Sequence, residues 1–193
     1  YDGVTFPNYV TYDNPETIWA FGKRNDLLKF TYDLTGDYGV KDHRVLINAS
    51  DELVDNYEDE GDLRKQFYLV PEYGYTPVCY LAVNKCMFLG ESIPSDDKFM
   101  LALRLSEAYL ILAEATAKTD PMIALNAVNE LRKKRISEEK YKDKSGLSGD
   151  ELLEFVRNER RRELCFEGHR WFDLRRYGMP SFTRVWKEGG VPA

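Results

Sequence analysis

Histidine and cysteine are scarce in this sequence, which leaves few residues for metal or nucleophilic chemistry. The 193 residues include two histidines, His43 and His169, and three cysteines. There is no Cys-x-x-Cys pair and no cysteine has a histidine partner, so we expect no metal site. His169 lies in the run Glu-Gly-His-Arg-Trp and is expected to pack or cap rather than to act as a base.

The cysteines leave one structural question open. Cys79 and Cys86 are close enough in sequence to face each other across a short hairpin. In an oxidising compartment they could form a disulfide; otherwise both are small apolar residues, as is Cys165.

Long apolar runs and an excess of positive charge are also absent. No run approaches the roughly 20 apolar residues of a membrane-spanning helix. The net charge is -6, so we do not expect a nucleic-acid partner. The basic runs at 132–135 and 160–162 lie in segments that also contain glutamate, which is typical of charge-balanced helical faces.

The composition changes near residue 98. Residues 1–98 are rich in Gly, Pro, Asn, Asp and aromatic residues, with only short periodic segments, whereas 99–193 are mostly helical in pattern. We expect one continuous, mainly α domain, in which helical hairpins pack with an irregular loop-rich region containing a few short strands. The region 1–98 is expected to face the ligand.

Short elements are expected within the loop-rich region. Ser50 or Asp51 suits the N-cap of a short helix up to Tyr57. Aromatic and branched residues over 63–70 and 78–83 predict two strands, which are candidates for a hairpin. Residues 15–21 fit either a strand or a helical turn.

From Lys98 onward, the pattern predicts an antiparallel helical hairpin. Asp120 suits the N-cap and Pro121 the first turn of its second helix. The short break between the helices and their small residues predict a tetratricopeptide-like unit. The stripe expected to be buried on the first helix is Leu101, Leu105, Ala108, Leu112 and Ala115. On the second helix it is Ala124, Val128 and Leu131.

A third helix is expected to open at the capping box 148–151 and to include the charged run 159–176. Its apolar face contains a carboxylate, Glu163. A buried carboxylate is costly unless it is paired and hydrogen-bonded. We therefore expect a structural ion network, with Arg176 as a further cation. Its members are Arg160, Glu163, Glu167, Arg170 and Asp173.

The same carboxylates are the best candidates for acid–base catalysis. Glu163 and Glu167 share one helical face, but each has an arginine within helical reach that should keep it ionised. A glycosidase pair needs one carboxylic acid with a raised pKa. The sequence also has no Gly-rich phosphate loop and no Gly-x-Ser-x-Gly motif. We expect no catalytic residues and no cofactor.

Aromatic residues are plentiful and concentrate in the first hundred residues, with 13 Tyr, 10 Phe and 3 Trp in the whole chain. Sugar faces stack on such rings while amide and carboxylate groups bond the hydroxyls. Each aromatic residue taken alone also fits ordinary packing. The candidate ligand residues are Trp19, Phe21, Tyr32, Tyr38 and Asn25, with Asp26, Asp37 and Asp42 nearby.

Five segments carry motifs in an order and spacing that belong together. They are 14–19, 50–64, 104–115, 124–132 and 159–176. The last, Glu-Arg-Arg-Arg-Glu-Leu-Cys-Phe-Glu-Gly-His-Arg-Trp-Phe-Asp-Leu-Arg-Arg, is long and specific. Over most of its length the chain closely resembles the SusD/RagB family.

This resemblance implies a binding protein rather than an enzyme. Members of the family are outer-membrane lipoproteins that capture oligosaccharides at the cell surface and deliver them to a TonB-dependent, SusC-like transporter. Their ligand contacts come from variable loops, so only the region after 14–19 carries over as ligand-facing. The alternatives are a helical-repeat adaptor that binds protein, and a peptide-binding lid of the same family.

The chain is shorter than the resemblance implies. The lipid-anchor cysteine, which would be the only link to the membrane, and most of the N-terminal repeat helices of the family have no counterpart here. Residues 1–193 are therefore expected to be the C-terminal portion of a longer protein. One apolar face that the missing part would cover is expected to be exposed.

Overall fold

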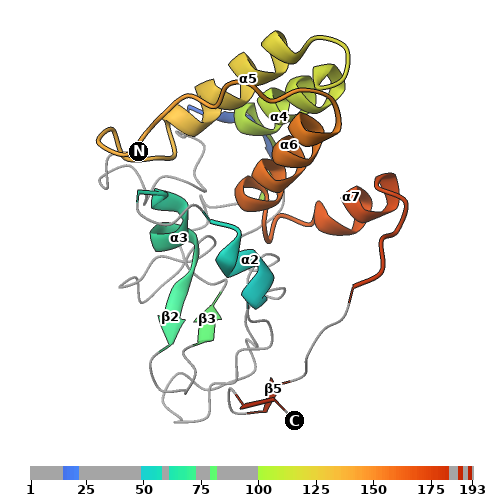
Figure 1. Cartoon of the computed structure of the whole chain (residues 1–193). Coiled ribbons are helices and arrows are strands. Elements are labelled where there is room, and N and C mark those ends of the chain that lie inside the picture. The colour runs from blue at the N-terminus through green and yellow to red at the C-terminus, as the bar shows by residue number, and fades with distance from the viewer. Residues whose placement is uncertain are drawn as a thin grey trace.

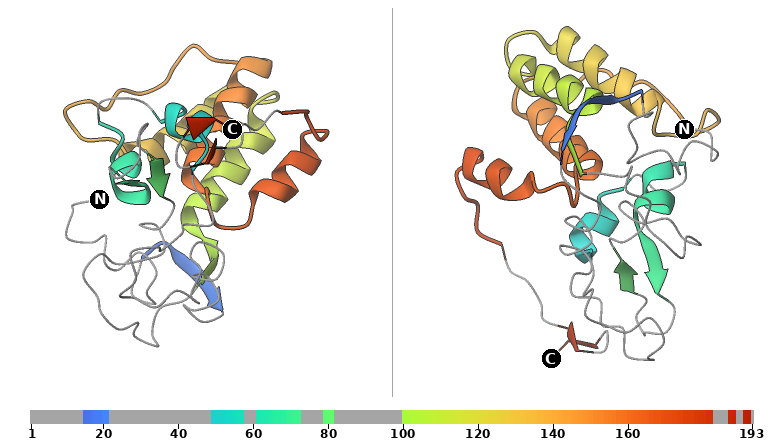
Figure 2. Two further views of the ribbon diagram at one scale, coloured as in Figure 1. Left: turned by 90° about the horizontal axis from the view of Figure 1, so that it is seen from below. Right: turned by 180° about the vertical axis from the view of Figure 1, so that it is seen from behind.

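The computed structural model describes residues 15–21, 49–57, 61–72, 79–81, 100–182, 187–188 and 191–192. Three long helices, α4 (Leu105–Thr116), α5 (Pro121–Lys133) and α6 (Gly149–Glu163), pack against one another (Figures 1 and 2). The short helices are α2 (Asp51–Asp55), α3 (Leu63–Tyr68) and α7 (Arg170–Arg176). The expected mainly α fold with a helical hairpin is confirmed.

Within the described ranges, three short antiparallel strand pairs accompany the helices. β1 (Thr17–Phe21) pairs with β4 (Met100–Arg104), which leads directly into α4. β2 (Val70–Glu72) pairs with β3 (Cys79–Leu81), and β5 (Lys187–Glu188) pairs with β6 (Val191–Pro192). The β1–β4 pair joins a segment near the start of the chain to the helical region.

Helix α5 forms where its local signals predict. The Asp120 side chain accepts a hydrogen bond from the Ile123 amide at 3.2 Å, and Pro121 occupies the first turn. The predicted stripe of α5 is buried. The hairpin packs closely against α6 because the residues at the contact are small, and the core consists of Ala113, Ala117, Ala124, Ala127, Val128, Leu152 and Val156.

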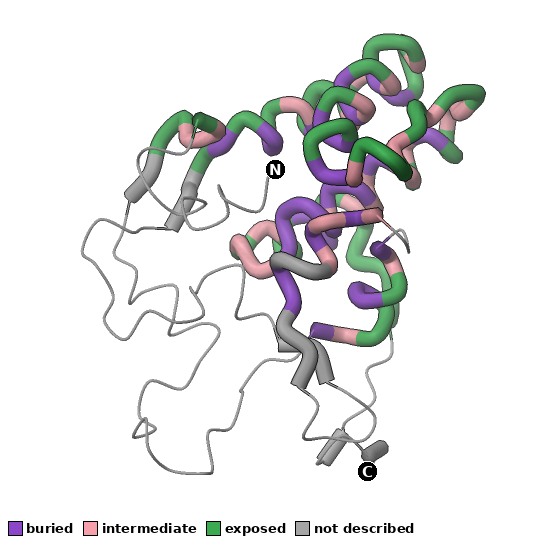
Figure 3. Tube along the Cα trace, turned by 90° about the vertical axis from the view of Figure 1, so that its left-hand side faces the viewer, coloured by how far each residue is buried: buried purple, intermediate pink, exposed green. Residues whose placement is uncertain are grey.

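The predicted stripe of α4 is wrong, because the helix is rotated. Leu105, Ala108, Leu112 and Ala115 are exposed, and the buried positions are Ser106, Glu107, Leu110 and Ala113. Figure 3 shows exposed turns on the outside of this region and buried ones between the helices. The rotation has a polar cause. Arg160 Nη2 donates to Glu107 Oε1 at 3.1 Å, and Arg104 donates to Ser106, so ion pairing draws this polar face inward.

Two further predictions of secondary structure are wrong, one because of a helix cap and the other because of strand pairing. Residues 63–68 form a helix rather than a strand, because the Asp62 side chain accepts from the Arg64 amide at 3.1 Å and caps it. Residues 100–104 form a strand before the helix begins, because β1 pairs with them. The strand alternative for 15–21, the strand within 78–83 and the helix capped by Ser50 are confirmed.

The charged run 159–176 is not one helix. Helix α6 ends at Glu163 and α7 begins at Arg170. In between, Phe166 has φ 62° and Gly168 has φ 82°, left-handed conformations that end a helix. Ser148 is the N-cap of α6 as expected, but its side chain makes no capping hydrogen bond.

Backbone hydrogen bonds at and near Gly61 connect the segment before α3 to the loop after α5. The Gly61 carbonyl accepts from the Ser137 amide at 2.8 Å, and the Leu63 amide donates to the Arg135 carbonyl at 2.9 Å. Gly61 has φ 108°, and an added Cβ would lie 2.6 Å from Lys140 Cβ. Neither the backbone conformation nor the space admits a side chain here.

We expect Gly61→Ala to lower the free energy of unfolding by about 3 kcal/mol, through backbone strain and the clash with Lys140. Gly146→Ala is the matched control, because Gly146 also has positive φ but faces open space. It should cost only about 1 kcal/mol. Urea unfolding measures both, and equal losses would contradict the close approach at Gly61.

Candidate functional site

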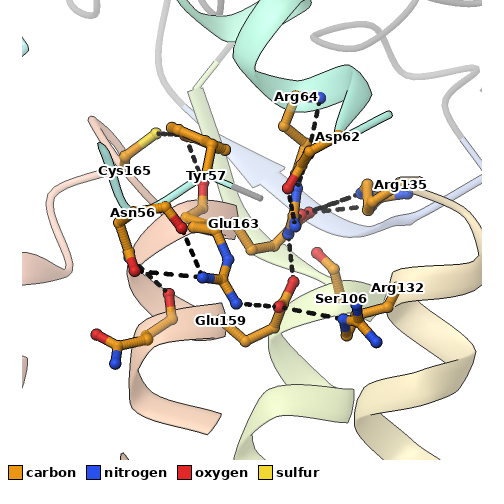
Figure 4. Close-up of polar contacts among 12 residues, drawn as sticks. Asn56, Tyr57, Asp62, Arg64, Ser106, Arg132, Arg135, Glu159, Glu163 and Cys165 are labelled. Carbon is orange, nitrogen blue, oxygen red and sulfur yellow. Dashed lines mark hydrogen bonds and ion pairs between the residues drawn. The ribbon is translucent and has the colours of Figure 1, made fainter. Parts of the chain in front are cut away.

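Two fully buried carboxylates on α6, Glu159 and Glu163, are the centre of the ion network (Figure 4). Glu163 receives arginines from three separate parts of the chain. Arg104 Nη1 lies 2.5 Å from Glu163 Oε1, Arg135 Nε lies 3.0 Å from Oε2, and Arg64 Nη1 lies 3.3 Å from Oε2. These arginines come from the end of β4, the loop after α5 and α3, so a single carboxylate fixes all three against α6.

Glu159 forms the second half of the cluster. Arg64 also donates to Glu159, and Arg162 Nη2 donates to Glu159 Oε2 at 2.6 Å. Asp62 forms a further salt bridge with Arg64, with Asp62 Oδ2 at 2.7 Å from Arg64 Nη2. The Tyr57 hydroxyl donates to the Arg162 carbonyl at 3.0 Å and so attaches α2 to the same cluster.

An outer set of pairs extends the network. Arg104 is bidentate to Glu167, with Nε–Oε2 and Nη2–Oε1 distances of 2.8 and 2.7 Å. Arg135 Nη2 donates to both oxygens of Glu16 at 2.6 and 2.7 Å, immediately before β1. Bidentate contacts of this kind are strong and geometrically specific.

Some members of the predicted network pair with each other in the described residues. Glu163 is buried as expected, and Arg160 Nε pairs with Asp173 at 3.0 Å. The partners predicted for Glu163 and Glu167 are wrong, because both bind arginines distant in sequence instead of neighbours on the same helix. Arg170 forms no ion pair with any residue in the described part of the chain.

The arginines that bind Glu163 are not among the residues predicted for the ion network. Arg64, Arg104 and Arg135 are all buried. One local signal was available: Arg104 stands between Leu103 and Leu105 in an apolar segment, where a charge is improbable unless it is paired. Nothing local indicates that its partner lies 59 residues away.

The pKa values show that these carboxylates are structural. Burial alone would raise the pKa of Glu159, but Arg64 and Arg162 outweigh it and lower the pKa to about 2. Burial likewise opposes ionisation of Glu163, yet Arg135, Arg104 and Arg64 hold its pKa well below the usual value. Neither group has the raised pKa that a general acid requires.

Of the predicted ligand residues, the structure describes only part of β1. Trp19 lies opposite Leu103 of β4, is 57% exposed, and has an irregularity in strand register on each side. The side chain of Phe21 is outside the described residues. The other candidates also lie outside the described residues; they are Tyr32, Tyr38, Asn25, Asp26, Asp37 and Asp42. The same is true of His43, and of Cys86, one of the two cysteines of the possible disulfide.

The described residues contain no cluster of three or more metal-binding side chains. Nor does this part of the chain contain a helix that is long and apolar enough to cross a membrane. His169 lies at the N-terminal end of α7, with Nδ1 3.4 Å from Glu107 Oε1, which agrees with a packing role.

We expect Glu163→Ala to lower the free energy of unfolding by about 3 kcal/mol, because it leaves buried arginines without their counter-charge. Glu154→Ala is the matched control, since Glu154 is exposed on the same helix and its loss should change stability by less than about 0.5 kcal/mol. Chemical denaturation measures both. A parental midpoint for Glu163→Ala would refute burial of the pair.

Acid should weaken the cluster in a defined range. The pKa of Glu159 is lowered from its ordinary 4.5 to about 2 in the folded protein. Its stabilising contribution is therefore complete above about pH 4.5 and is lost as the pH falls toward 2. We expect the free energy of unfolding to fall over this range, and to fall less steeply in Glu159→Gln than in Glu154→Gln. Identical slopes in the two variants would contradict the role of Glu159.

Comparison with known proteins supports the resemblance. A sequence model of the SusD family matches residues 13–191. The structure of a SusD-like carbohydrate binding protein from Bacteroides vulgatus is similar over 97% of this chain and 40% of that one, with 26% identity and a TM-score of 0.70. A SusD homolog from Bacteroides thetaiotaomicron shares the fold over 91% of this chain and 40% of that one, with 22% identity and a TM-score of 0.63.

A curated relative agrees with these structures. SusD-like protein P38 of Formosa agariphila is 29% identical over 141 residues, which are 66% of this chain and 27% of that protein. The chain thus spans less than half the length of these relatives. Because the family match extends over nearly all of its residues, the chain belongs to the SusD/RagB family.

Proposed function

We propose that this chain is part of a cell-surface protein that binds oligosaccharides and takes part in their uptake. The observation that carries the proposal is the family match over residues 13–191, together with the similarity to a protein described as a SusD-like carbohydrate binding protein. The protein is not proposed to be an enzyme. Its best acid–base candidates are ionised and held by arginines.

The geometry supports different roles for two parts of the chain, one as a rigid scaffold and the other as the ligand-binding surface. Buried ion pairs and the small-residue core fix α4, α5 and α6, and the β1–β4 pair projects from this fixed part. Trp19 is exposed on β1, and irregularities of register tend to re-aim side chains. An exposed ring on a rigid support loses little entropy when a sugar stacks on it. We assign ligand contact to residues 1–98 and support to 99–193.

Uptake requires a partner that moves the sugar across the membrane. We infer that the full-length protein is lipid-anchored at the outer membrane and delivers its ligand to a TonB-dependent, SusC-like transporter. The family membership supports this inference. Co-purification of the transporter with the full-length protein tests it, and an isolated monomer in mild detergent would count against it.

The second candidate function, a helical-repeat adaptor for protein, would use the outward face of α4. The outward face of α4 presents an apolar surface of four positions, Leu105, Ala108, Leu112 and Ala115. Faces of this kind usually pack against another element. Relatives are more than twice as long as the aligned region, so further helices of a longer protein are the occupant we favour over a separate partner.

Glycan-array screening of the full-length protein, followed by calorimetry, discriminates between these functions. We expect saturable binding of at least one oligosaccharide class, because a rigid scaffold carries exposed aromatic residues. Tight binding of peptides or proteins with no sugar binding would reject the carbohydrate function in favour of the adaptor or a peptide-binding lid.

Trp19 is the described residue that tests the ligand surface. We expect Trp19→Ala to weaken oligosaccharide binding about tenfold through loss of ring stacking, with an unchanged far-ultraviolet circular dichroism spectrum. Ile18→Ala is the matched control, because Ile18 is a neighbouring apolar residue of β1 with a similar exposure. Equal affinities of the two variants would show that Trp19 does not contact the ligand.

A further inference from the structure

The residues that line a pocket come from α2, the C-terminal end of α6, the segment after it and the start of α7. These elements can be located in Figure 1. The volume of the pocket is about 430 Å³, within the range of small-ligand sites. Leu53, Leu164 and Phe166 supply apolar wall. The left-handed backbone at Phe166 and Gly168 shapes this wall by turning the chain out of α6.

The charged residues that line the pocket are mostly positive, whereas the chain as a whole is negative. Three arginines, Arg160, Arg161 and Arg170, line the pocket with a single carboxylate, Asp173, although the chain as a whole carries -6. Asp173 already pairs with Arg160 at 3.0 Å and with Arg176 at 2.9 Å. It is therefore not available to neutralise the remaining arginines.

Two guanidinium groups at the pocket lack full compensation. The Arg160 side chain is only 6% exposed, and its Nη1 is buried without a hydrogen-bond partner in the described part of the chain, although Nε and Nη2 are paired. A buried donor without an acceptor is costly. Arg170 has no ion pair among the described residues. Burial lowers its pKa, and the charge of Arg161 lowers it further.

The carboxylates of Glu52 and Asp173 offset only part of the effect of burial and of Arg161 on Arg170, because the pKa of Arg170 is still lowered. Arg161 Nη1 pairs with Glu52 Oε1 at 2.6 Å, but Glu52 is largely exposed and does not line the pocket. Glu107 is shared between Arg160 and His169. An anion beside Arg170 would offset the positive charge of Arg161 and the burial of the Arg170 guanidinium group.

An aromatic ring stands beside these cations. Trp171 lines the pocket and is 57% exposed. A ring next to arginines suits a ligand with both a flat apolar face and an anionic group, and an acidic sugar has both.

We propose that this pocket binds an acidic saccharide, with the sugar carboxylate against Arg170 and the sugar ring against Trp171. The proposal rests on the proposed carbohydrate function and names a class of ligand for it. It also adds a binding surface separate from Trp19.

The test is a titration of the full-length protein followed by nuclear magnetic resonance of the tryptophan indole N–H groups, with Trp171→Phe identifying the signal. The probes are D-galacturonate and D-glucuronate, the matched neutral hexoses D-galactose and D-glucose, and sodium sulfate. We expect both uronates to shift the Trp171 signal saturably, and the neutral hexoses to leave it unchanged.

Matched variants locate the site. Arg170→Gln should weaken uronate binding about tenfold, which corresponds to one charge-assisted hydrogen bond. Arg175→Gln removes the same charge from an exposed position of α7 outside the pocket and should change the affinity less than twofold. Trp171→Ala should weaken uronate binding, read by calorimetry, whereas Phe172→Ala should not, because Phe172 is equally exposed on α7 but does not line the pocket.

Three outcomes would overturn the proposal. They are an unshifted Trp171 signal at saturating uronate, equal affinities of Arg170→Gln and Arg175→Gln, and an equal response to sulfate and uronate, which would indicate a simple anion site. If neutral glycans still bind the full-length protein elsewhere, the carbohydrate function stands and only this pocket is rejected. If no saccharide binds at all, both proposals fail.

Discussion

The structure depends on the burial of two carboxylates, Glu159 and Glu163, in the middle of a helical bundle. A buried carboxylate without partners is unstable, so α6 occupies this position only if arginines arrive from elsewhere. They come from α3, the end of β4 and the loop after α5, with side chains that are themselves almost fully buried. Each pair is satisfied only when both segments are in place. The cluster therefore determines how distant segments assemble, more than any single apolar contact does.

The same cluster decides which surfaces are left for function. Arg104 donates to Ser106 and Arg160 donates to Glu107, and these bonds turn the polar side of α4 inward. The apolar side then faces out, where another element can pack against it. Because the carboxylates are committed to arginines, the proposed ligand contacts are assigned to aromatic residues and to arginines outside the cluster. Trp19 and the pair Arg170 and Trp171 fit that description.

Local features could be predicted from the sequence, because their causes lie within a few residues. The caps at Ser50 and Asp120 and the buried face of α5 are of this kind. The rotation of α4 could not be predicted, since its apolar spacing favours the opposite face and an ion pair 53 residues distant overrides it. The same holds for the partners of Glu163. Of the proposed ligand surface, the sequence indicated only Trp19, in a segment that fitted either a strand or a helical turn. The pocket lined by Arg170 could not be predicted, because it depends on the break between α6 and α7, which the charge pattern does not reveal.

The central claim is that Glu163 couples α6 to segments far away in sequence. A double-mutant cycle between Arg104 and Glu163, using Arg104→Met, Glu163→Gln and the combined variant, measures this coupling directly by chemical denaturation. The account predicts a coupling free energy on the order of 2 kcal/mol, so that the combined variant is much less destabilised than the sum of the single ones. A coupling indistinguishable from zero would show that the two side chains stabilise the protein independently, and would contradict the account.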